Sequence, residues 1–280
     1  MLVKKIDEVR NLVKEWKKQG LTVGYVPTMG ALHEGHESLI RRAVEENDKV
    51  IVSVFVNPTQ FGPNEDYDSY PRNIEKDMEL CKNAGAAAVF NPEPSEMYFE
   101  NRSTSVSVSG LTGVLCGAKR PGHFDGVCLV VTKFFNIIKP DRAYFGEKDA
   151  QQVAVLKRMV RDLSFDIEII PCPIIREEDG LAKSSRNTYL NDDERKAALV
   201  LSRSLKTAKV MLDNGERNAE TIKEAMISLI SKEPLAKIDY VEIVDSEDLT
   251  SVKSIERNIL IPIAVYIGKT RLIDNFTYEV

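Results

Sequence analysis

The chain contains the stretch Val23-Gly24-Tyr25-Val26-Pro27-Thr28-Met29-Gly30-Ala31-Leu32-His33-Glu34-Gly35-His36, followed by the amphipathic run Leu39–Val44. The apolar start predicts a strand, the glycines predict a turn, and the amphipathic run predicts a helix. A helix start offers unpaired backbone N–H groups and the positive end of the helix dipole, which favour bound phosphate. His33 and His36 add donors there, and the glycines allow a nucleotide to approach the backbone.

The first part of the chain alternates predicted strands and helices. Val50–Val56 is a continuous apolar run, typical of a strand buried on both faces of a parallel sheet. Further strands are predicted at Leu21–Val26, Ala87–Phe90, Arg142–Phe145 and Phe165–Ile170, with Ser105–Ser109 as an edge strand, and helices at His36–Glu46, Ile74–Ala84, Val127–Ile138 and Ala150–Asp162. Repeated β-α-β units predict an α/β fold with a doubly wound parallel sheet, which binds ligands at the carboxyl ends of its strands.

The pattern changes near Pro171-Cys172-Pro173 and the acidic turn Glu177–Gly180, which mark a domain boundary. Long helices are then predicted at Asp192–Leu212 and Ala219–Ser231, and strands at Asp239–Val244, Asn258–Tyr266 and Thr270–Asp274. Gly268-Lys269 is a plausible hairpin turn between the last two strands. We therefore expect a doubly wound domain over residues 1–175 and a small C-terminal α+β domain over residues 176–280.

Composition narrows the class of protein. A net charge of −5 argues against a dedicated nucleic-acid binder. The apolar runs Val50–Val56 and Ile259–Ile267 are too short to cross a bilayer, so no membrane partner is expected. Residues Met1–Glu8 lack the apolar core of a signal peptide, and the 4 cysteines form no C-x-x-C pair. These features predict a cytoplasmic protein with buried free thiols and small-molecule ligands.

Polar segments follow several predicted strands. Asn57–Gly62 carries amides suited to substrate binding, although a capping turn would use the same residues. In Gly146–Gln152, Lys148 is placed to meet phosphate and Asp149 to hold a ribose hydroxyl, but a simple helix cap with a solvated lysine is an equal alternative. Lys183-Ser184-Ser185-Arg186 sets hydroxyls beside cations, which suits a phosphate clamp. Arg120–Gly126 is glycine-rich and contains His123, for which the sequence gives no role.

Two alternatives exist for the paired histidines: the chance placement of two surface histidines, which is the commoner case for such a segment alone, and a zinc site. Zinc-binding H-E-x-x-H helices place two histidines four residues apart on one face. His33 and His36 are three residues apart with Gly35 between them, and no nearby cysteine or third histidine completes a site. The segment instead resembles the HxGH motif that nucleotidylyltransferases and class I aminoacyl-tRNA synthetases use on ATP. The net charge disfavours the tRNA-charging branch.

The motifs together resemble the pantothenate synthetase family over nearly the whole chain and in the family's order. They are PTMGALHEGH (27–36), FVNPTQF (55–61), YPR (70–72), RPGHFDGV (120–127), YFGEKDAQQ (144–152) and the SSR of KSSR (184–186). The resemblance implies a Rossmann-like domain with a smaller C-terminal lid domain, as a homodimer. It also implies a ligase that condenses pantoate with β-alanine using ATP and Mg²⁺, yielding pantothenate, AMP and pyrophosphate through pantoyl adenylate, as in coenzyme A precursor biosynthesis.

The resemblance also implies roles for individual residues. His36, as proton donor, His33 and Lys148 would be catalytic. ATP would contact Met29, Gly30, Ala31, Leu32, His33, Glu34, Gly35, His36, Gly146, Glu147, Lys148, Asp149, Ile175, Lys183, Ser184, Ser185 and Arg186. Gln60 and Gln152 would hold pantoate, and Gln60 also β-alanine. Asp77 matches one of two acidic positions tied to Mg²⁺, while Lys76 departs from the other and Lys183 replaces a commonly apolar residue.

Two other functions compete with this interpretation. Another HxGH nucleotidylyltransferase, such as one that makes a dinucleotide cofactor, would retain AMP in its product and need no amine. A non-enzymatic nucleotide sensor would be expected to lose His36 or Lys148, and the chain has both. A carboxylate that attacks the α-phosphate develops charge on the phosphate oxygens, which fixed donors and cations stabilise.

Overall fold

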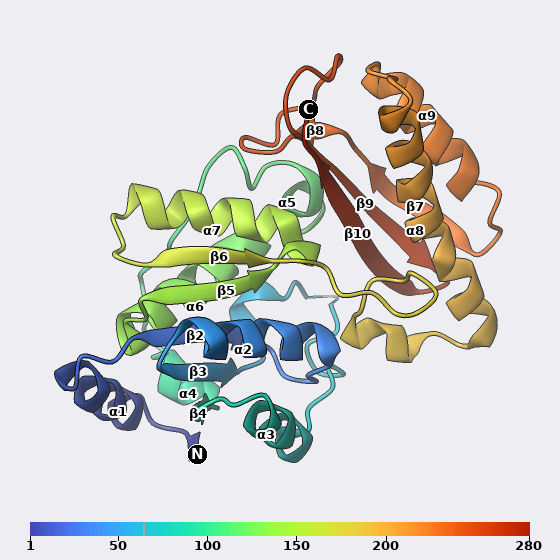
Figure 1. Ribbon diagram of the computed structural model, residues 1–280. Helices are drawn as coiled ribbons and strands as arrows, with labels where there is room; N and C mark the ends of the chain where they lie inside the picture. Colours follow the sequence, from blue (N-terminus) through green and yellow to red (C-terminus); the bar gives the residue numbers. More distant parts are fainter. Residues whose placement is uncertain (64) are drawn as a thin grey trace. The chain divides into compact units, whose positions relative to one another are not determined.

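The computed structural model describes residues 1–63 and 65–280 (Figure 1). Contacts divide the chain into two compact units. The first contains Met1–Glu147 and Val155–Pro173, and the second contains Lys148–Ala154 and Ile174–Val280. The sequence-based boundary between residues 175 and 176 remains a prediction.

The first unit is built on a six-stranded sheet, which confirms the predicted doubly wound α/β class. In spatial order its strands are β1 (Leu2–Val3), β4 (Ala88–Phe90), β3 (Lys49–Val54), β2 (Val23–Thr28), β5 (Arg142–Gly146) and β6 (Glu168–Cys172). Every pairing in the sheet is parallel. The chain moves outward from β2 through β3 to β4 and then returns to place β5 on the other side of β2. The strand order therefore reverses between β2 and β5, which is where open parallel sheets bind ligands.

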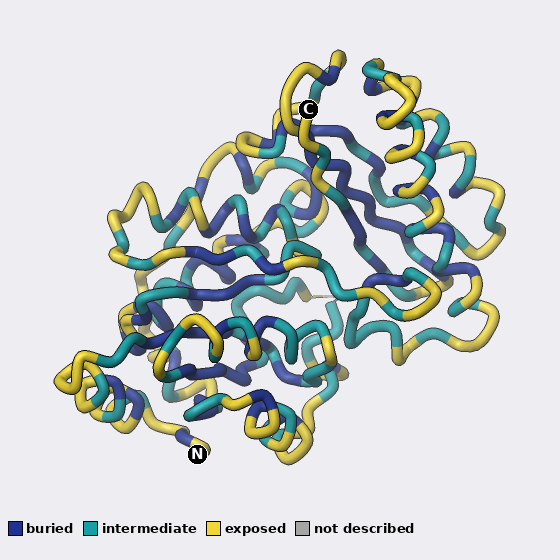
Figure 2. The backbone as a smooth tube through the Cα atoms, viewed as in Figure 1, coloured by how far each residue is buried: buried dark blue, intermediate teal, exposed yellow. Residues whose placement is uncertain are grey.

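Helices cover both faces of this sheet, and the strands are buried as the apolar runs predict (Figure 2). On one face, α2 (Glu34–Glu46) and α3 (Ile74–Asn83) pack their apolar residues, including Ile40 and Cys81, against β2 and β3. On the other face, Phe134 of α6 (His123–Ile138) makes ring contacts with Tyr25 and Phe90. The other α-helices up to residue 162 are α1 (Ile6–Lys18), α4 (Pro94–Met97), α5 (Leu115–Lys119) and α7 (Ala150–Asp162).

One expected element is wrong. Ser105–Ser109 is loop, not an edge strand. The edges of the described sheet are β1 and β6, so the segment has no ladder partner. Its alternation has a local cause, because Val108 is buried and its carbonyl accepts the Thr112 hydroxyl at 2.5 Å while its serine neighbours stay exposed.

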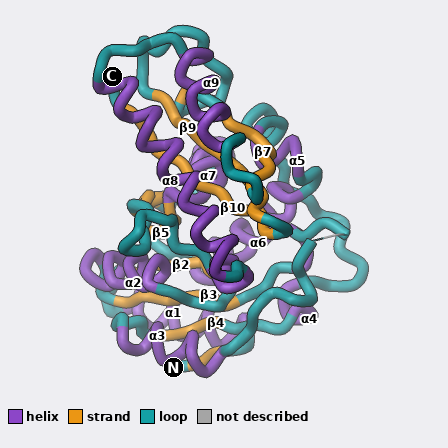
Figure 3. The backbone as a smooth tube through the Cα atoms, turned by 90° about the vertical axis from the view of Figure 1, so that its right-hand side faces the viewer, coloured by secondary structure: helices purple, strands orange, loops and turns teal. Residues whose placement is uncertain are grey.

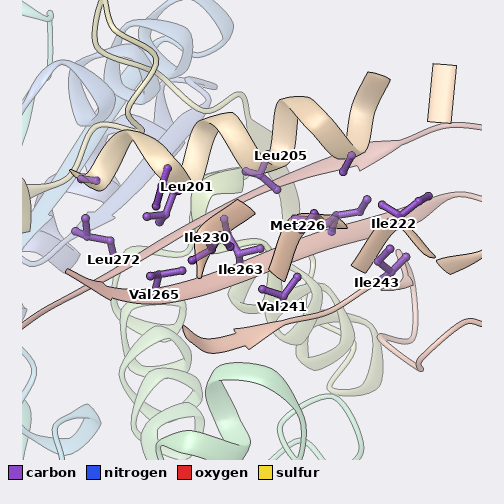
Figure 4. Packing of buried hydrophobic residues seen from close by; sticks show 14 of the residues in the cluster. Leu201, Leu205, Ile222, Met226, Ile230, Val241, Ile243, Ile263, Val265 and Leu272 are labelled. Atoms are coloured by element: carbon purple, nitrogen blue, oxygen red, sulfur yellow. The ribbon is translucent and has the colours of Figure 1, made fainter. Parts of the chain in front are cut away.

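The second unit is a small α+β structure. Its antiparallel sheet has the order β10 (Thr270–Tyr278), β9 (Ile259–Ile267), β7 (Ala236–Val241), and β8 (Val244–Asp245) also pairs with β9. Figure 3 shows the helices α8 (Asp192–Asp213) and α9 (Ala219–Ile230) beside these strands. Leu201 and Leu205 of α8 belong with Ile263 to one buried cluster (Figure 4). Thr270 pairs with Ile267, so Gly268-Lys269 is a two-residue hairpin turn, as predicted.

Two structural observations concern the cysteines and the apolar character of the helices. The 4 cysteines Cys81, Cys116, Cys128 and Cys172 are buried free thiols, as expected. Burial raises the pKa of Cys81 and of Cys128 to about 12, which makes both thiols poor nucleophiles. Among residues 1–63 and 65–280, no helix combines the length and the apolar character needed to cross a membrane.

Candidate active site

The paired histidines form the start of α2. His33 is the N-cap residue, and its Nδ1 accepts the Gly35 N–H at 3.1 Å. The Nδ1 of His36 accepts the His33 N–H at 3.3 Å, so the two side chains and the backbone form a reciprocal cap. An Nδ1 that accepts a backbone N–H carries no proton, so each neutral ring carries its proton on Nε2. Local sequence thus builds a helix start at which two imidazoles can act as donors.

The turn before His33 has an unusual backbone. Gly30 has φ 90° and Ala31 has φ 51°, both in the left-handed region that side chains disfavour. The carboxylate of Asp77, on α3, accepts the N–H of Ala31 at 3.1 Å and the N–H of Leu32 at 2.8 Å. A Cβ at position 30 would lie 2.9 Å from Asp77 Oδ2, so the turn needs glycine there. Asp77 therefore holds the backbone of the predicted ATP-binding turn in shape.

Asp77 does not fit a magnesium site well. Its relative exposure is 2%, and both of its oxygens are engaged by the backbone. Burial raises its pKa, against the lowering effect of the two N–H groups. Across residues 1–63 and 65–280, no group of three His, Cys, Asp or Glu side chains is arranged to hold a metal ion. The expected role of Asp77 toward Mg²⁺ remains a prediction without geometric support.

Gln60 ends the short helix η1 (Pro58–Gln60) that follows β3. The amide nitrogen of Asn57 donates to Gln60 Oε1 at 3.0 Å, which leaves the Gln60 amide nitrogen to face away from Asn57. That nitrogen lies 3.2 Å from Met29 Sδ. The structure therefore brings the predicted pantoate-binding amide against the predicted ATP-binding turn within the first unit. Asn57 also caps η1 by accepting the Thr59 N–H at 3.3 Å, so the capping alternative holds for Asn57 as well.

Asn57 and Tyr98 were not singled out individually by the sequence. Asn57 is 1% exposed, and its Oδ1 accepts the Tyr98 hydroxyl at 2.7 Å. Its Nδ2 also donates to Gly126 O at 3.1 Å. A buried amide in this many bonds has one orientation, which it imposes on Gln60. The signal for Asn57 was its position directly after a buried strand, whereas nothing local pointed to Tyr98.

The second unit contains the predicted phosphate lysine. Lys148 lies in the short helix η2 (Glu147–Asp149), before α7, and its side chain is 22% exposed. Its Nζ is 4.0 Å from Asp149 Oδ2. The Asn275 side chain, on β10, donates to the Lys148 carbonyl at 2.9 Å. Asn275 is 5% exposed, and no local pattern pointed to it because β10 is 127 residues away. Gln152 follows in the first turn of α7, partly buried.

The loop Lys183–Arg186 is held by a polar network in the same unit. Lys183 N–H donates to the carbonyl of Ile175 at 2.9 Å, which joins the predicted adenine contact to the predicted phosphate clamp. Ser184 Oγ accepts the Arg186 N–H at 3.3 Å and caps the helix η3 (Ser185–Tyr189). Lys183, Ser185 and Arg186 are half-buried. Lys183 thus helps to hold the loop through its backbone N–H.

Glu177 fastens this loop to α8. Its carboxylate accepts the Asn187 amide at 2.8 Å and the Arg195 guanidinium at 2.8 Å. Burial raises the pKa of Glu177, but the bonds from Asn187 and Arg195 and the charge of Arg195 oppose this effect, and the net pKa is below the usual value. The ionised carboxylate is therefore the form that the loop uses.

In the first unit, the predicted site residues follow the carboxyl ends of neighbouring strands. The segments Met29–His36 and Gly146–Glu147 leave the carboxyl ends of β2 and β5, the two strands between which the order reverses. Gln60 follows the neighbouring strand β3. A strand, a glycine turn and a histidine-capped helix at a switch point define a doubly wound α/β protein with a candidate ligand site between β2 and β5.

Comparison with known proteins specifies the family. A family model described as pantoate-beta-alanine ligase matches residues 1–277. The pantothenate synthetase of Clostridium acetobutylicum is 68% identical over 275 residues, which are 98% of each chain. A crystal structure of pantothenate synthetase from Thermus thermophilus is 44% identical and matches with a TM-score of 0.94 over 98% of both chains.

A third comparison involves ligands. The pantoate-beta-alanine ligase of Francisella tularensis, in a crystal structure complexed with beta-gamma ATP and beta-alanine, is 36% identical. It matches with a TM-score of 0.80 over 99% of this chain and 97% of that chain. The chain belongs to the pantoate-beta-alanine ligase family.

Proposed function

We propose that this ligase condenses pantoate with β-alanine at the expense of ATP, and that Met29–His36, Gln60 and Lys148 carry the chemistry. Family membership supports the reaction. The observation that carries the residue assignment is the 3.2 Å contact of Gln60 Nε2 with Met29 Sδ, because it joins an amide suited to an acid with the nucleotide turn. ATP as a substrate agrees with the beta-gamma ATP bound by the Francisella tularensis relative.

In the first step, a pantoate carboxylate oxygen bonds to the α-phosphorus, and the bond from that phosphorus to pyrophosphate breaks. Negative charge increases on the departing pyrophosphate and on the α-phosphate oxygens. The Nε2–H groups of His33 and His36 and the N–H groups at the start of α2 are donors suited to that charge. Lys148 supplies a cation, and Gly146–Asp149 and Lys183–Arg186 complete the ATP contacts, with Ile175 at the adenine.

In the second step, the β-alanine amine attacks the acyl carbon of pantoyl adenylate, loses a proton and displaces AMP. Gln60 and Gln152 are assigned to pantoate, and Gln60 also to β-alanine. A carboxylate nucleophile must be oriented without being neutralised, and a neutral amide does this better than an arginine would. The Asn57 bond to Gln60 Oε1 supports the assignment, since it fixes which end of the Gln60 amide is presented.

The proposal also covers the metal ion, the oligomeric state, the location and the domain boundary. Mg²⁺ is expected to accompany ATP, since this ion is usually held by substrate phosphates with few protein ligands. We also propose a homodimer, a cytoplasmic location, and a lid domain that begins at residue 176. Sedimentation of the purified chain tests the homodimer, and limited proteolysis around residues 174–180 tests the boundary.

The reaction is tested by pyrophosphate release with ATP, Mg²⁺ and a panel of hydroxy acids, with and without β-alanine. Pantoate is expected to support pyrophosphate release, and β-alanine is expected to displace AMP from pantoyl adenylate with formation of pantothenate. Release with another acid but not with pantoate, or AMP retained in the final product, would overturn the proposal.

A further inference from the structure

The segment Arg120–Gly126 has no part in the assigned chemistry, although it contains His123. It runs from the end of α5 into the start of α6, with Gly122 in the left-handed region at φ 79°. Three of its contacts converge on η1, which ends in Gln60. These are a side-chain bond from His123, a close backbone approach at Gly126 and the bond from Asn57 to Gly126 O.

His123 Nδ1 lies 2.8 Å from the carbonyl oxygen of Gln60. A carbonyl only accepts, so Nδ1 carries the proton and donates it. His123 Nε2 lies 2.9 Å from Arg120 Nη1, and a guanidinium only donates, so Nε2 accepts. The two partners therefore fix His123 as a neutral ring in a single tautomer and orientation.

Arg120 is itself held in place by Glu65. Its Nε and Nη2 donate to the two oxygens of that carboxylate at 2.6 and 2.5 Å, a paired arrangement with defined geometry. The side chains are only 20% and 25% exposed. Burial raises the pKa of Glu65, but the bonds from Arg120 and from the Gly62 N–H act in the opposite direction, and the net pKa lies below its usual value, so the carboxylate stays ionised. The arginine that orients His123 is thus rigid.

Gly126 brings α6 against the same short helix. A Cβ at this position would lie 2.2 Å from Thr59 O and 2.7 Å from Gln60 Cα, distances that no side chain tolerates. Backbone contact on one side and the His123 bond on the other leave Gln60 little freedom. Asn57 then orients its amide group, as described above.

We propose that His123 is a positioning residue for the acid-binding amide: by donating from Nδ1 to Gln60 O, it sets where Gln60 meets pantoate. The inference rests on the proposed role of Gln60. It gives the Arg120–Gly126 motif a function in substrate affinity without direct substrate contact. Glu65, Arg120 and His123 form a relay of fixed geometry that ends at the Gln60 backbone.

Two conservative variants separate the bonds of His123. Asparagine carries its amide nitrogen near the place of Nδ1, so His123→Asn can still donate to Gln60 O. Glutamine carries its amide oxygen near the place of Nε2, so His123→Gln keeps the acceptor for Arg120 and loses the donor to Gln60. If the ring mattered only for packing, the two variants would behave alike. His123→Ala removes both bonds.

Calorimetric titration with pantoate, in the presence of an ATP analogue that cannot transfer its adenylyl group, is the test, with ATP titration in the absence of pantoate as the control. We expect pantoate affinity to fall about three- to tenfold in His123→Gln and His123→Ala. His123→Asn should restore most of it, while ATP affinity stays unchanged in all three. Gln60→Ala is the reference variant. Equal pantoate affinity in His123→Asn and His123→Gln would overturn the inference, and this comparison decides even if His123→Ala fails to fold.

The reference variant Gln60→Ala distinguishes a failure of the positioning role of His123 from a failure of the assignment of Gln60 to pantoate. If Gln60→Ala weakens pantoate binding and His123→Gln does not, the positioning role is wrong while the assignment of Gln60 stands. If Gln60→Ala leaves pantoate affinity unchanged, the assignment of Gln60 is wrong, and the inference falls with it.

Discussion

The N–H of Leu32 donates to the carboxylate of Asp77 across 2.8 Å, linking α3 to the turn that precedes the histidines. The same carboxylate accepts the N–H of Ala31, whose φ of 51° is costly for a residue with a side chain. The turn is therefore held from outside, by an element that follows it in the chain.

Asp77→Asn is expected to loosen the turn and lower ATP affinity. An asparagine side chain offers one acceptor oxygen where the turn presents two donors, so one N–H loses its partner at a cost of about 1–3 kcal/mol. Pyrophosphate release measured against ATP concentration reports the change. Ala31→Gly in the Asp77→Asn background should recover part of the loss, because glycine accepts the left-handed backbone without strain.

Asp77→Asn also distinguishes two roles of Asp77: a clamp that holds the turn in shape, and a ligand of Mg²⁺. A clamp predicts that the Mg²⁺ concentration for half-maximal activity stays the same in Asp77→Asn when ATP is saturating. A metal ligand predicts a clear rise in that concentration. A rise would restore the magnesium role that the resemblance assigns to Asp77.

His36→Ala is expected to slow adenylate formation about 100-fold or more while the fold persists. The donor of interest is Nε2–H, since Nδ1 is occupied by the His33 N–H. His36→Gln places an amide nitrogen near Nε2 and should retain more activity than His36→Asn, which reproduces only the Nδ1 acceptor. Single-turnover measurement with ATP and pantoate gives the rate. An asparagine variant as fast as the glutamine variant would show that His36 acts as a helix cap and not as a phosphate donor.

Sequence patterns predicted those local structures that depend on residues close together in the chain. The strand, glycine turn and helix start around His33 and His36 and the Gly268-Lys269 hairpin follow from local rules for helices and turns, although the cap formed by His33 was not predicted. The order of strands was inferred only as a class, because apolar runs show that strands are buried but not which strands pair. The expected strand at Ser105–Ser109 failed for this reason, since its alternation said nothing about a partner.

The contacts that shape the site escaped sequence reasoning because they join distant residues. His123 and Gln60 are 63 positions apart, and Asp77 and Ala31 are 46 apart. A histidine or aspartate of this kind has no local signature, since its partner is a backbone group and backbone groups are identical along the chain. The residues that touch substrate lie in recognisable motifs, whereas their supports are visible only after folding.

Lys148→Ala is expected to separate the two half-reactions. Its charge opposes the triphosphate, so ATP binding and adenylation should both weaken. Attack of β-alanine on preformed adenylate should suffer less, because pyrophosphate has already left. Rapid-mixing measurements with purified pantoyl adenylate and β-alanine isolate the second step. Lys157→Ala removes an exposed lysine of α7 and controls for net charge. An equal loss in both steps would indicate a structural role for Lys148.

Glu46, at the end of α2, gives a pH-dependent prediction. Hydrogen bonds from Arg42 at 2.9 Å and Tyr144 at 2.8 Å lower its pKa, with the Arg42 bond the larger cause. A lowered native pKa means that the ionised group contributes stability above its unfolded pKa of about 4.3 and loses it as pH falls through the native value. Glu46→Gln should therefore be less stable than the parent chain at pH 7, with the difference shrinking below about pH 4.3.

Chemical denaturation at several pH values measures that difference. Glu45→Gln, at an exposed neighbouring position, serves as the matched control and should follow the parent chain. A difference for Glu46→Gln that is constant from pH 7 down to pH 3.5 would show that ionisation of Glu46 does not stabilise the fold.

Gly126→Ala is expected to disturb the acid site through the backbone. The added Cβ would lie 2.2 Å from Thr59 O, so α6 and η1 must separate, and overpacking of this kind costs about 1–3 kcal/mol. Because Gln60 ends η1, pantoate affinity should fall more than ATP affinity. Gly113→Ala is the matched control, since its Cβ would meet its nearest neighbour at an ordinary 3.5 Å. Thermal melting and calorimetric pantoate titration of both variants make the comparison. Normal pantoate affinity in a destabilised Gly126→Ala would mean that η1 can shift without moving the acid-binding amide.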